Sequence, residues 1–184
     1  MTETGPSSSG SEISADTTLD RDLVRDGGPA LVIVADGVTL DLGGHTVSGP
    51  PDVRGRGPGI LLRGVSGATV RNGTVQRFDA GVAVQGGGGN VIEGLVVENN
   101  LGSNDGDFGD GIVVNNSTGN RIQDNVLRSN GPFSGISLGP GASDNEILRN
   151  TVADHDMGHA GYPDAGRQTM GIRIEGPAAN RNRV

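Results

Sequence analysis

One repeat of the chain reads Gly111-Ile112-Val113-Val114, then a polar turn, then Asn120-Arg121-Ile122, and then a third apolar position at Leu127. The opening motif, G-I-x-V, has further copies at Ala30–Ile33, Gly59–Leu62, Gly81–Val84, Gly135–Leu138 and Gly171–Ile174. The N-x-[IV] motif returns at Asn90, Asn145 and Asn182, and the third apolar position returns at Val47, Val75, Val97 and Val152. Self-similarity of this kind identifies a repeat protein.

Each repeat holds three short apolar segments that alternate with polar residues and are separated by Gly or Asn turns, which predicts strands rather than helices. The 22 residues from Leu62 to Val84 fit one coil of three strands. Each strand is then expected to pair in parallel with its copy in the next coil, so that like residues stack into ladders. Two ladders are predicted: Leu31, Ile60, Val82, Ile112, Ile136 and Ile172, and Ile33, Leu62, Val84, Val114, Leu138 and Ile174. The predicted fold is all-β, a single-stranded parallel β-helix of about five to six coils.

The composition agrees with such a solenoid. The 184 residues include 34 glycines, three Phe, one Tyr and no Trp, so Val, Ile and Leu must fill the interior. We expect residues 1–12, which lack a periodic apolar pattern, to be a disordered tail, and residues 13–184 to form the β-helix. Because the chain stops inside a predicted strand, we expect this domain to be truncated at its C-terminal end.

Charge and targeting signals exclude several classes of partner. The net charge is −8, and all 14 basic residues are arginine, without a basic patch that would favour nucleic acid. No apolar run is long enough to span a membrane, and residues 1–12 do not resemble a signal peptide. The absence of cysteine removes disulfides and thiol catalysis, and leaves localisation open. The oligomeric state is also open.

The segment Asp36–Gly49, read with the G-I-x-V and N-x-I motifs, resembles the first full coil of right-handed parallel β-helix repeat proteins of the pectin-lyase-like superfamily. The resemblance covers residues 13–184 and implies a right-handed solenoid. It is less specific for activity, because this superfamily includes polysaccharide lyases, glycoside hydrolases, epimerases, esterases and proteins with binding or structural roles. Members often carry a cysteine pair that aligns near Ser11 and Arg25, and this chain lacks it.

Insertions gather at one corner of the predicted coil. Between the third apolar position and the next first strand the chain has 15, 9, 17, 11 and 22 residues in successive coils. Insertions on one face of a repeat protein commonly build its binding face. Arg54 and Arg56 lie in the first long loop, where guanidinium groups can bind carboxylates or hydroxyls, and Phe78 and Asp79 are expected on the intervening shelf. These four residues are the predicted substrate-binding set, with a polysaccharide or oligosaccharide as partner.

The second long loop contains Asp105, Asp107 and Asp110, whose carboxylates could converge on Ca²⁺. The third contains His155, His159, Tyr162 and Arg167, which are candidates for acid–base catalysis. For each loop the alternative is a solvated polar segment. We expect loops 98–110 and 153–170 to wall one groove, because both connect the same two strands of their coils.

Other polar residues are interpreted as structural. Asn90, Asn120, Asn145 and Asn182 are predicted to stack at one corner, with Asn125 and Asn150 repeating the arrangement. His45 is interpreted as a turn-packing residue. Two functions remain: a carbohydrate-active enzyme, most simply a lyase or epimerase acting on an acidic glycan, or a non-catalytic β-helix module that binds glycan or serves as a rigid spacer.

Overall fold

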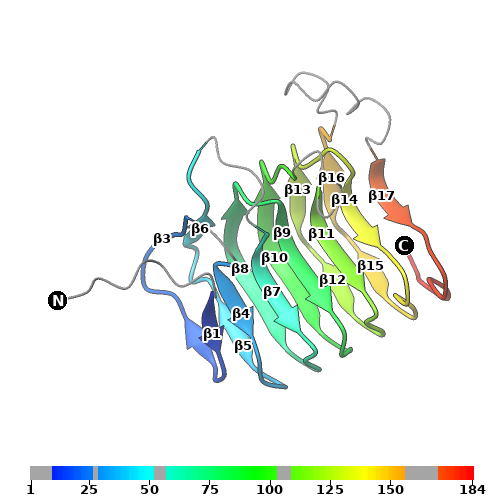
Figure 1. The fold of residues 1–184 in the computed structure, drawn as a ribbon, viewed down its shortest axis with the longest axis horizontal. Coiled ribbons are helices and arrows are strands. Elements are labelled where there is room, and N and C mark those ends of the chain that lie inside the picture. Colours follow the sequence, from blue (N-terminus) through cyan, green and yellow to red (C-terminus); the bar gives the residue numbers. More distant parts are fainter. Residues whose placement is uncertain (1–9, 27–28, 52–56, 103–108, 156–169) are drawn as a thin grey trace, which may run out of the picture.

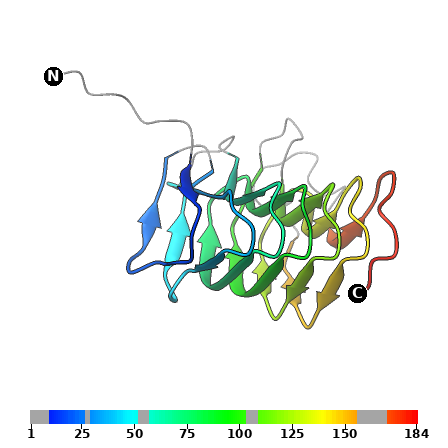
Figure 2. The same ribbon diagram turned by 90° about the horizontal axis from the view of Figure 1, so that it is seen from below.

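The computed structural model describes residues 10–26, 29–51, 57–102, 109–155 and 170–184. In these residues all strand pairs are parallel, and they form the two sheets of a solenoid (Figures 1 and 2). Sheet A contains β1 (Ser11–Ile13), β4 (Leu31–Ile33), β7 (Pro58–Arg63), β9 (Ala80–Gln85), β11 (Asp110–Asn115), β14 (Ser134–Leu138) and β17 (Met170–Ile174).

Sheet B forms the other two sides of each coil. Its strands are β2 (Thr17–Thr18), β3 (Leu23–Val24), β5 (Thr39–Asp41), β6 (Thr46–Ser48), β8 (Thr69–Gln76), β10 (Val91–Glu98), β12 (Arg121–Gln123), β13 (Val126–Arg128), β15 (Glu146–Leu148) and β16 (Thr151–Ala153). Strands β8 and β10 run through both sides, whereas the other coils use two short strands. Strands β1 to β16 therefore build six three-sided coils, and β17 opens a seventh.

Both predicted apolar ladders are confirmed by the strand register. Ile60, Val82, Ile112, Ile136 and Ile172 are successive partners in sheet A, as are Leu62, Val84, Val114, Leu138 and Ile174. Their side chains fill one continuous core together with the inward residues of sheet B, such as Val70, Ile92 and Ile122. Because a single coil buries little by itself, this core exists only between stacked coils.

The glycine of the G-I-x-V motif is required by close packing. A Cβ atom at Gly81 would lie 2.3 Å from Cγ1 of Val97, and one at Gly135 would lie 2.5 Å from Cγ1 of Val152. Both distances are far below van der Waals contact. The glycine of the motif therefore lies where a strand of sheet A begins, and it packs directly against the last apolar residue of sheet B.

The first coil begins at Ser11 and lacks this motif. Strand β1 pairs with β4, and the coil is completed by β2 and β3, with Leu19 and Leu23 only partly buried. Arg25 Nη2 donates a hydrogen bond of 2.8 Å to Ser11 Oγ. This hydrogen bond joins the beginning and the end of the first coil.

No α-helix occurs in the described ranges, and accordingly none that could cross a membrane.

Candidate functional site

The outer surface of sheet A carries a second, smaller apolar cluster. Val32, Leu61, Ala83 and Val113 alternate with the inward residues of their strands and are buried, together with Ala80. They continue in register to Ser137 and Arg173. These outward side chains are therefore little exposed, although they point away from the main core.

Asp110 is the most unusual ionisable residue on this surface. It opens β11, lies in register with Ser134 of β14, and is only 6% exposed. Burial raises the pKa of Asp110 to about 6, while the polar groups of Ser134 and the charge of Arg173 partly oppose the rise. Asp110 Oδ1 and Ser134 Oγ make no hydrogen bond within the described residues. Asp110 is therefore a buried carboxyl that can exchange a proton near neutral pH.

Arg173 supplies positive charge to the same region. It lies on β17, its guanidinium carbon is 5.8 Å from the centre of the Phe133 ring, and it forms an ion pair with Glu175. A guanidinium held against an aromatic face is oriented as well as charged. Asp110, Ser134 and Arg173 come from three successive strands, so the stacking of coils assembles them.

The two predicted shelf residues lie directly before β9. Phe78 was expected on a surface shelf, but it is 1% exposed and belongs to the core, beneath Gly59. Asp79 is buried, and its Oδ2 accepts a 2.6 Å hydrogen bond from the backbone N–H of Gly57. Its carboxylate therefore anchors the end of the first long loop to β9.

His155 lies on a third polar ladder that the sequence analysis did not identify. Asn100 donates its amide to Asn130 Oδ1 at 2.9 Å, and His155 Nδ1 follows, 3.2 Å from the backbone nitrogen of Asn130. Burial lowers the pKa of His155, which the carbonyl groups of Asn130 and Leu127 partly oppose. Its Nε2 is buried, without a described hydrogen-bond partner. The imidazole is thus held in the corner of the coil, and a catalytic role for it stays a prediction.

In the sequence, this ladder can be found from its constant distance to the first asparagine ladder. Phe78, Asn100, Asn130 and His155 each lie ten residues after Ala68, Asn90, Asn120 and Asn145, which occupy the first ladder. The predicted loop 98–110 includes Asn99 and Asn100, which obscures this repeat in the sequence.

The remaining predicted site residues lie outside the described ranges: Arg54, Arg56, Asp105, Asp107, His159, Tyr162 and Arg167. Of the predicted Ca²⁺ ligands, only Asp110 is described. Among the residues that the structure describes, no group of three or more His, Asp or Glu side chains is arranged to hold a metal ion.

Comparison with known proteins identifies the family. Residues 14–176 match the family described as right handed beta helix region. The chain belongs to the right-handed beta helix family. The predicted right-handed parallel β-helix is thereby confirmed.

A 3-dehydroshikimate dehydratase from Acinetobacter baylyi is 36% identical to this right-handed beta helix protein over 98 residues. The match covers 50% of the chain but only 20% of that relative. A comparison with solved structures found no significant match.

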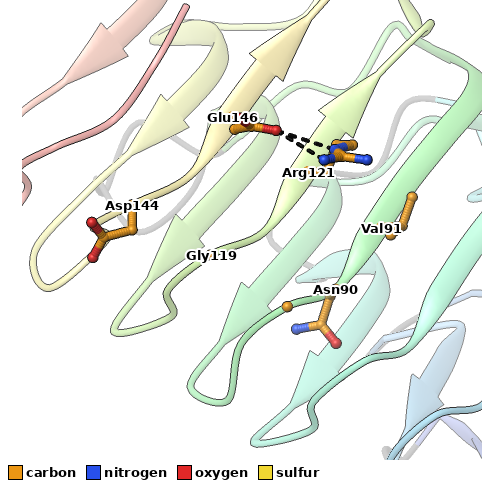
Figure 3. A pocket seen from close by; sticks show the side chains of 7 residues that line it. Asn90, Val91, Gly119, Arg121, Asp144 and Glu146 are labelled. Carbon is orange, nitrogen blue, oxygen red and sulfur yellow. Dashed lines mark hydrogen bonds and ion pairs between the residues drawn. The ribbon is translucent and has the colours of Figure 1, made fainter.

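A shallow depression of about 440 Å³ lies at a different corner of this right-handed beta helix protein, where sheet A leads into sheet B (Figure 3). Gly89 and Gly119 leave it open, and Arg121, Asp144 and Glu146 line it. Its charges are already matched, since Arg121 pairs with Glu146 at 3.1 Å and Asp144 pairs with Arg181 at 2.6 Å. None of the predicted site residues lines this depression. We therefore place the candidate site on the outer surface of sheet A, around Asp110.

Proposed function

We propose that the outer surface of sheet A around Asp110 binds a hydroxylated, carboxylate-bearing ligand of the acidic-glycan type, and that the protein removes a proton from it as a lyase or epimerase does. The observation that carries the proposal is Asp110 itself. A carboxyl that is 6% exposed, with one oxygen lacking a hydrogen bond in the described structure, reduces stability when it ionises. Active sites are where such groups are usually found.

The proposed chemistry needs a base and a positive charge. Asp110, with a pKa of about 6, is ionised above that pH and can accept the proton next to the substrate carboxylate. Arg173 would stabilise the negative charge that develops on the carboxylate. In a lyase the electrons of the broken C–H bond form a C=C bond, the C–O bond at the next carbon breaks, and the leaving oxygen takes up a proton. In an epimerase the proton returns from the opposite side.

The similarity to a dehydratase supports elimination in general. The name of that relative denotes removal of water, and elimination of water and elimination of a sugar alcohol both break a C–H and a C–O bond. The similar region covers a fifth of the relative, so the proposed substrate rests on the chemistry of the site and not on that name.

The test is incubation with oligouronates, with two readouts. Ultraviolet absorbance reports an unsaturated uronate, and deuterium uptake from D₂O reports proton removal without elimination. We expect Asp110→Asn to lose both signals. It should also raise Tm at pH 8 but not at pH 4, because ionisation of a buried acid whose pKa rises from 3.8 to about 6 costs the fold up to ~3 kcal/mol. The matched control is Asp124→Asn, which removes an exposed carboxylate paired with Arg149 on sheet B.

The expected Ca²⁺ site at Asp105, Asp107 and Asp110 is a separate proposal. If these carboxylates hold the cation, Ca²⁺ should raise Tm, and the pair of changes Asp107→Ala and Asp110→Ala should abolish the rise. No rise in the unaltered protein would reject the metal without affecting the proton-transfer proposal.

A non-catalytic glycan-binding module is the second candidate. It is favoured by the position of His155, which contacts Asn130 inside a corner of the coil. Within the described part of the site, Asp110 is therefore the only buried acid–base group with a pKa near neutral. Binding of oligouronates with neither absorbance change nor deuterium uptake would support this alternative. Turnover that survives Asp110→Asn would overturn the assignment of Asp110 as the base.

A further inference from the structure

Phe133 is a large aromatic residue that the packing of the solenoid does not explain. It directly precedes β14 and is partly buried. Among the described residues it belongs neither to the main core nor to the smaller apolar cluster on the outer surface of sheet A. Phe78, by contrast, lies within the main core. The contacts of the Phe133 ring lie instead at the candidate site.

The first contact of Phe133 is with the residue before Asp110. The backbone N–H of Phe133 donates a hydrogen bond of 2.8 Å to the carbonyl oxygen of Gly109. A Cβ atom at Gly109 would lie 2.7 Å from Cδ2 of the Phe133 ring, so the ring lies directly against the backbone of this glycine. Phe133 therefore restrains the backbone from which the Asp110 side chain projects.

The second contact of Phe133 is with β17. The backbone N–H of Met170 donates a hydrogen bond of 3.0 Å to the carbonyl oxygen of Phe133, and the guanidinium carbon of Arg173 lies 5.8 Å from the centre of the ring. A guanidinium at this distance is attracted to the face of an aromatic ring. Because β11, β14 and β17 are successive neighbours in sheet A (Figure 1), Phe133 belongs to the coil between those of Asp110 and Arg173.

The charge of Arg173 acts on Asp110 across this coil. Burial raises the pKa of Asp110 to about 6, and the positive charge of Arg173 opposes the rise, whereas the negative charge of Glu175 adds to it. The interaction between two charges weakens as their separation grows. A guanidinium that turned away from Phe133 would therefore act less on Asp110.

From these contacts we infer that Phe133 is a positioning residue of the site, which holds Arg173 at a fixed distance from Asp110. The inference rests on the proposed function in naming Asp110 as the base and Arg173 as the group that receives the substrate carboxylate. The ring acts through these two residues. By fixing their separation it favours substrates in which the carbon that loses the proton also carries the carboxylate, because only these place both groups correctly at once.

NMR titration of the Asp110 carboxyl in the full chain, without substrate, tests the inference, with Asp110→Asn to assign the signal. We expect Phe133→Leu to raise the pKa of Asp110 by about 0.5–1, because Arg173 is no longer held, and Phe133→Tyr, which keeps the ring, to leave it unchanged. Arg173→Gln should raise it at least as much. Adding Phe133→Leu to Arg173→Gln should then cause no further shift, because the ring has no cation left to hold.

The matched control is Phe78→Leu, the same change inside the main core. It should lower Tm without moving the titration of Asp110. Circular dichroism checks that each variant keeps the fold. A titration that Phe133→Leu leaves unchanged would overturn the inference, and so would equal shifts in Phe133→Leu and Phe78→Leu.

Turnover of oligouronates gives a separate readout. Phe133→Leu should move the acidic limb of the kcat/KM profile to higher pH by the same amount as the titration, whereas a structural defect alone lowers the rate equally at every pH. If the unaltered protein neither binds nor converts oligouronates, the proposed function fails, and the titration of Asp110 still decides the role of Phe133.

Discussion

His155 occupies the position at which the two preceding coils carry asparagine. Asn100 and Asn130 each accept a backbone N–H through Oδ1 and donate through Nδ2, from Asn100 to Val75 O and from Asn130 to Val97 O. Nδ1 of His155 lies 3.2 Å from the backbone nitrogen and 3.1 Å from the backbone oxygen of Asn130, so the imidazole occupies the place of the asparagine amide. Burial of the ring opposes a second proton, which lowers the pKa of His155.

This ladder makes stability depend on pH through one residue. Because the pKa of His155 is lowered in the folded state, its contribution is fully present above about 6.5 and is lost as the pH falls through the folded pKa. We expect His155→Asn to flatten the decline of Tm between pH 7 and pH 5 and to raise Tm by restoring an amide. His155→Gln should flatten the decline without the rise, because its longer side chain does not fit the ladder. An unchanged decline in both variants would show that other groups control acid sensitivity.

At the scale of the element, each corner combines a left-handed residue with a ladder. Asn72, Gly94, Asp124 and Arg149 have φ between 53° and 60° and bend sheet B, and Arg77, Asn99, Ser129 and Asp154 have φ between 54° and 63° before the Asn100 ladder. Only a few residue types adopt this conformation easily, mainly Gly, Asn and Asp. Asparagine then satisfies backbone groups inside the turn, which explains why polar residues are buried at the corners of an apolar core.

Strand interiors and outer surfaces should differ sharply in what a substitution costs. Ile112 is fully buried between Val82 and Ile136, so Ile112→Ala should lower the free energy of unfolding by about 2–5 kcal/mol. Arg121, with a half-exposed side chain paired to Glu146, should cost no more than about 1 kcal/mol when changed to alanine. Urea denaturation followed by circular dichroism measures both. Equal losses would contradict the observed inward and outward assignment.

The sequence predicts the sheets better than the site for a physical reason. Ladder residues such as Ile112 and Asn120 repeat in every coil, so their role can be inferred from spacing alone. Asp110 opens its strand where Ala80 and Ser134 open theirs, and nothing in its spacing shows that it is buried. The sequence predicts Asp110 as a Ca²⁺ ligand in an acidic loop, and the structure places it at the start of β11 with its pKa raised by burial. The first coil lacks the repeat motifs, and its strands are only two or three residues long.

The whole molecule is held together by contacts between neighbouring coils. Carboxylates pair with arginines of the next coil on the outer surface of sheet B, as in Asp41 with Arg71 and Asp124 with Arg149. The pKa of Asp41 is lowered mainly by the backbone N–H of Gly43, and that of Asp124 mainly by Arg149. These exposed pairs contribute little individually. The stability of a coil therefore depends chiefly on whether it has a neighbour on each side.

Amide hydrogen exchange should show this dependence directly. We expect the strongest protection in β9 and β11, which have neighbours on both sides, and progressively weaker protection toward β1 and β17, which have one. Leu23→Ala should weaken protection in the first coil alone, whereas Ile112→Ala should weaken it on both sides of β11. Protection that is uniform along the solenoid would contradict the nearest-neighbour account.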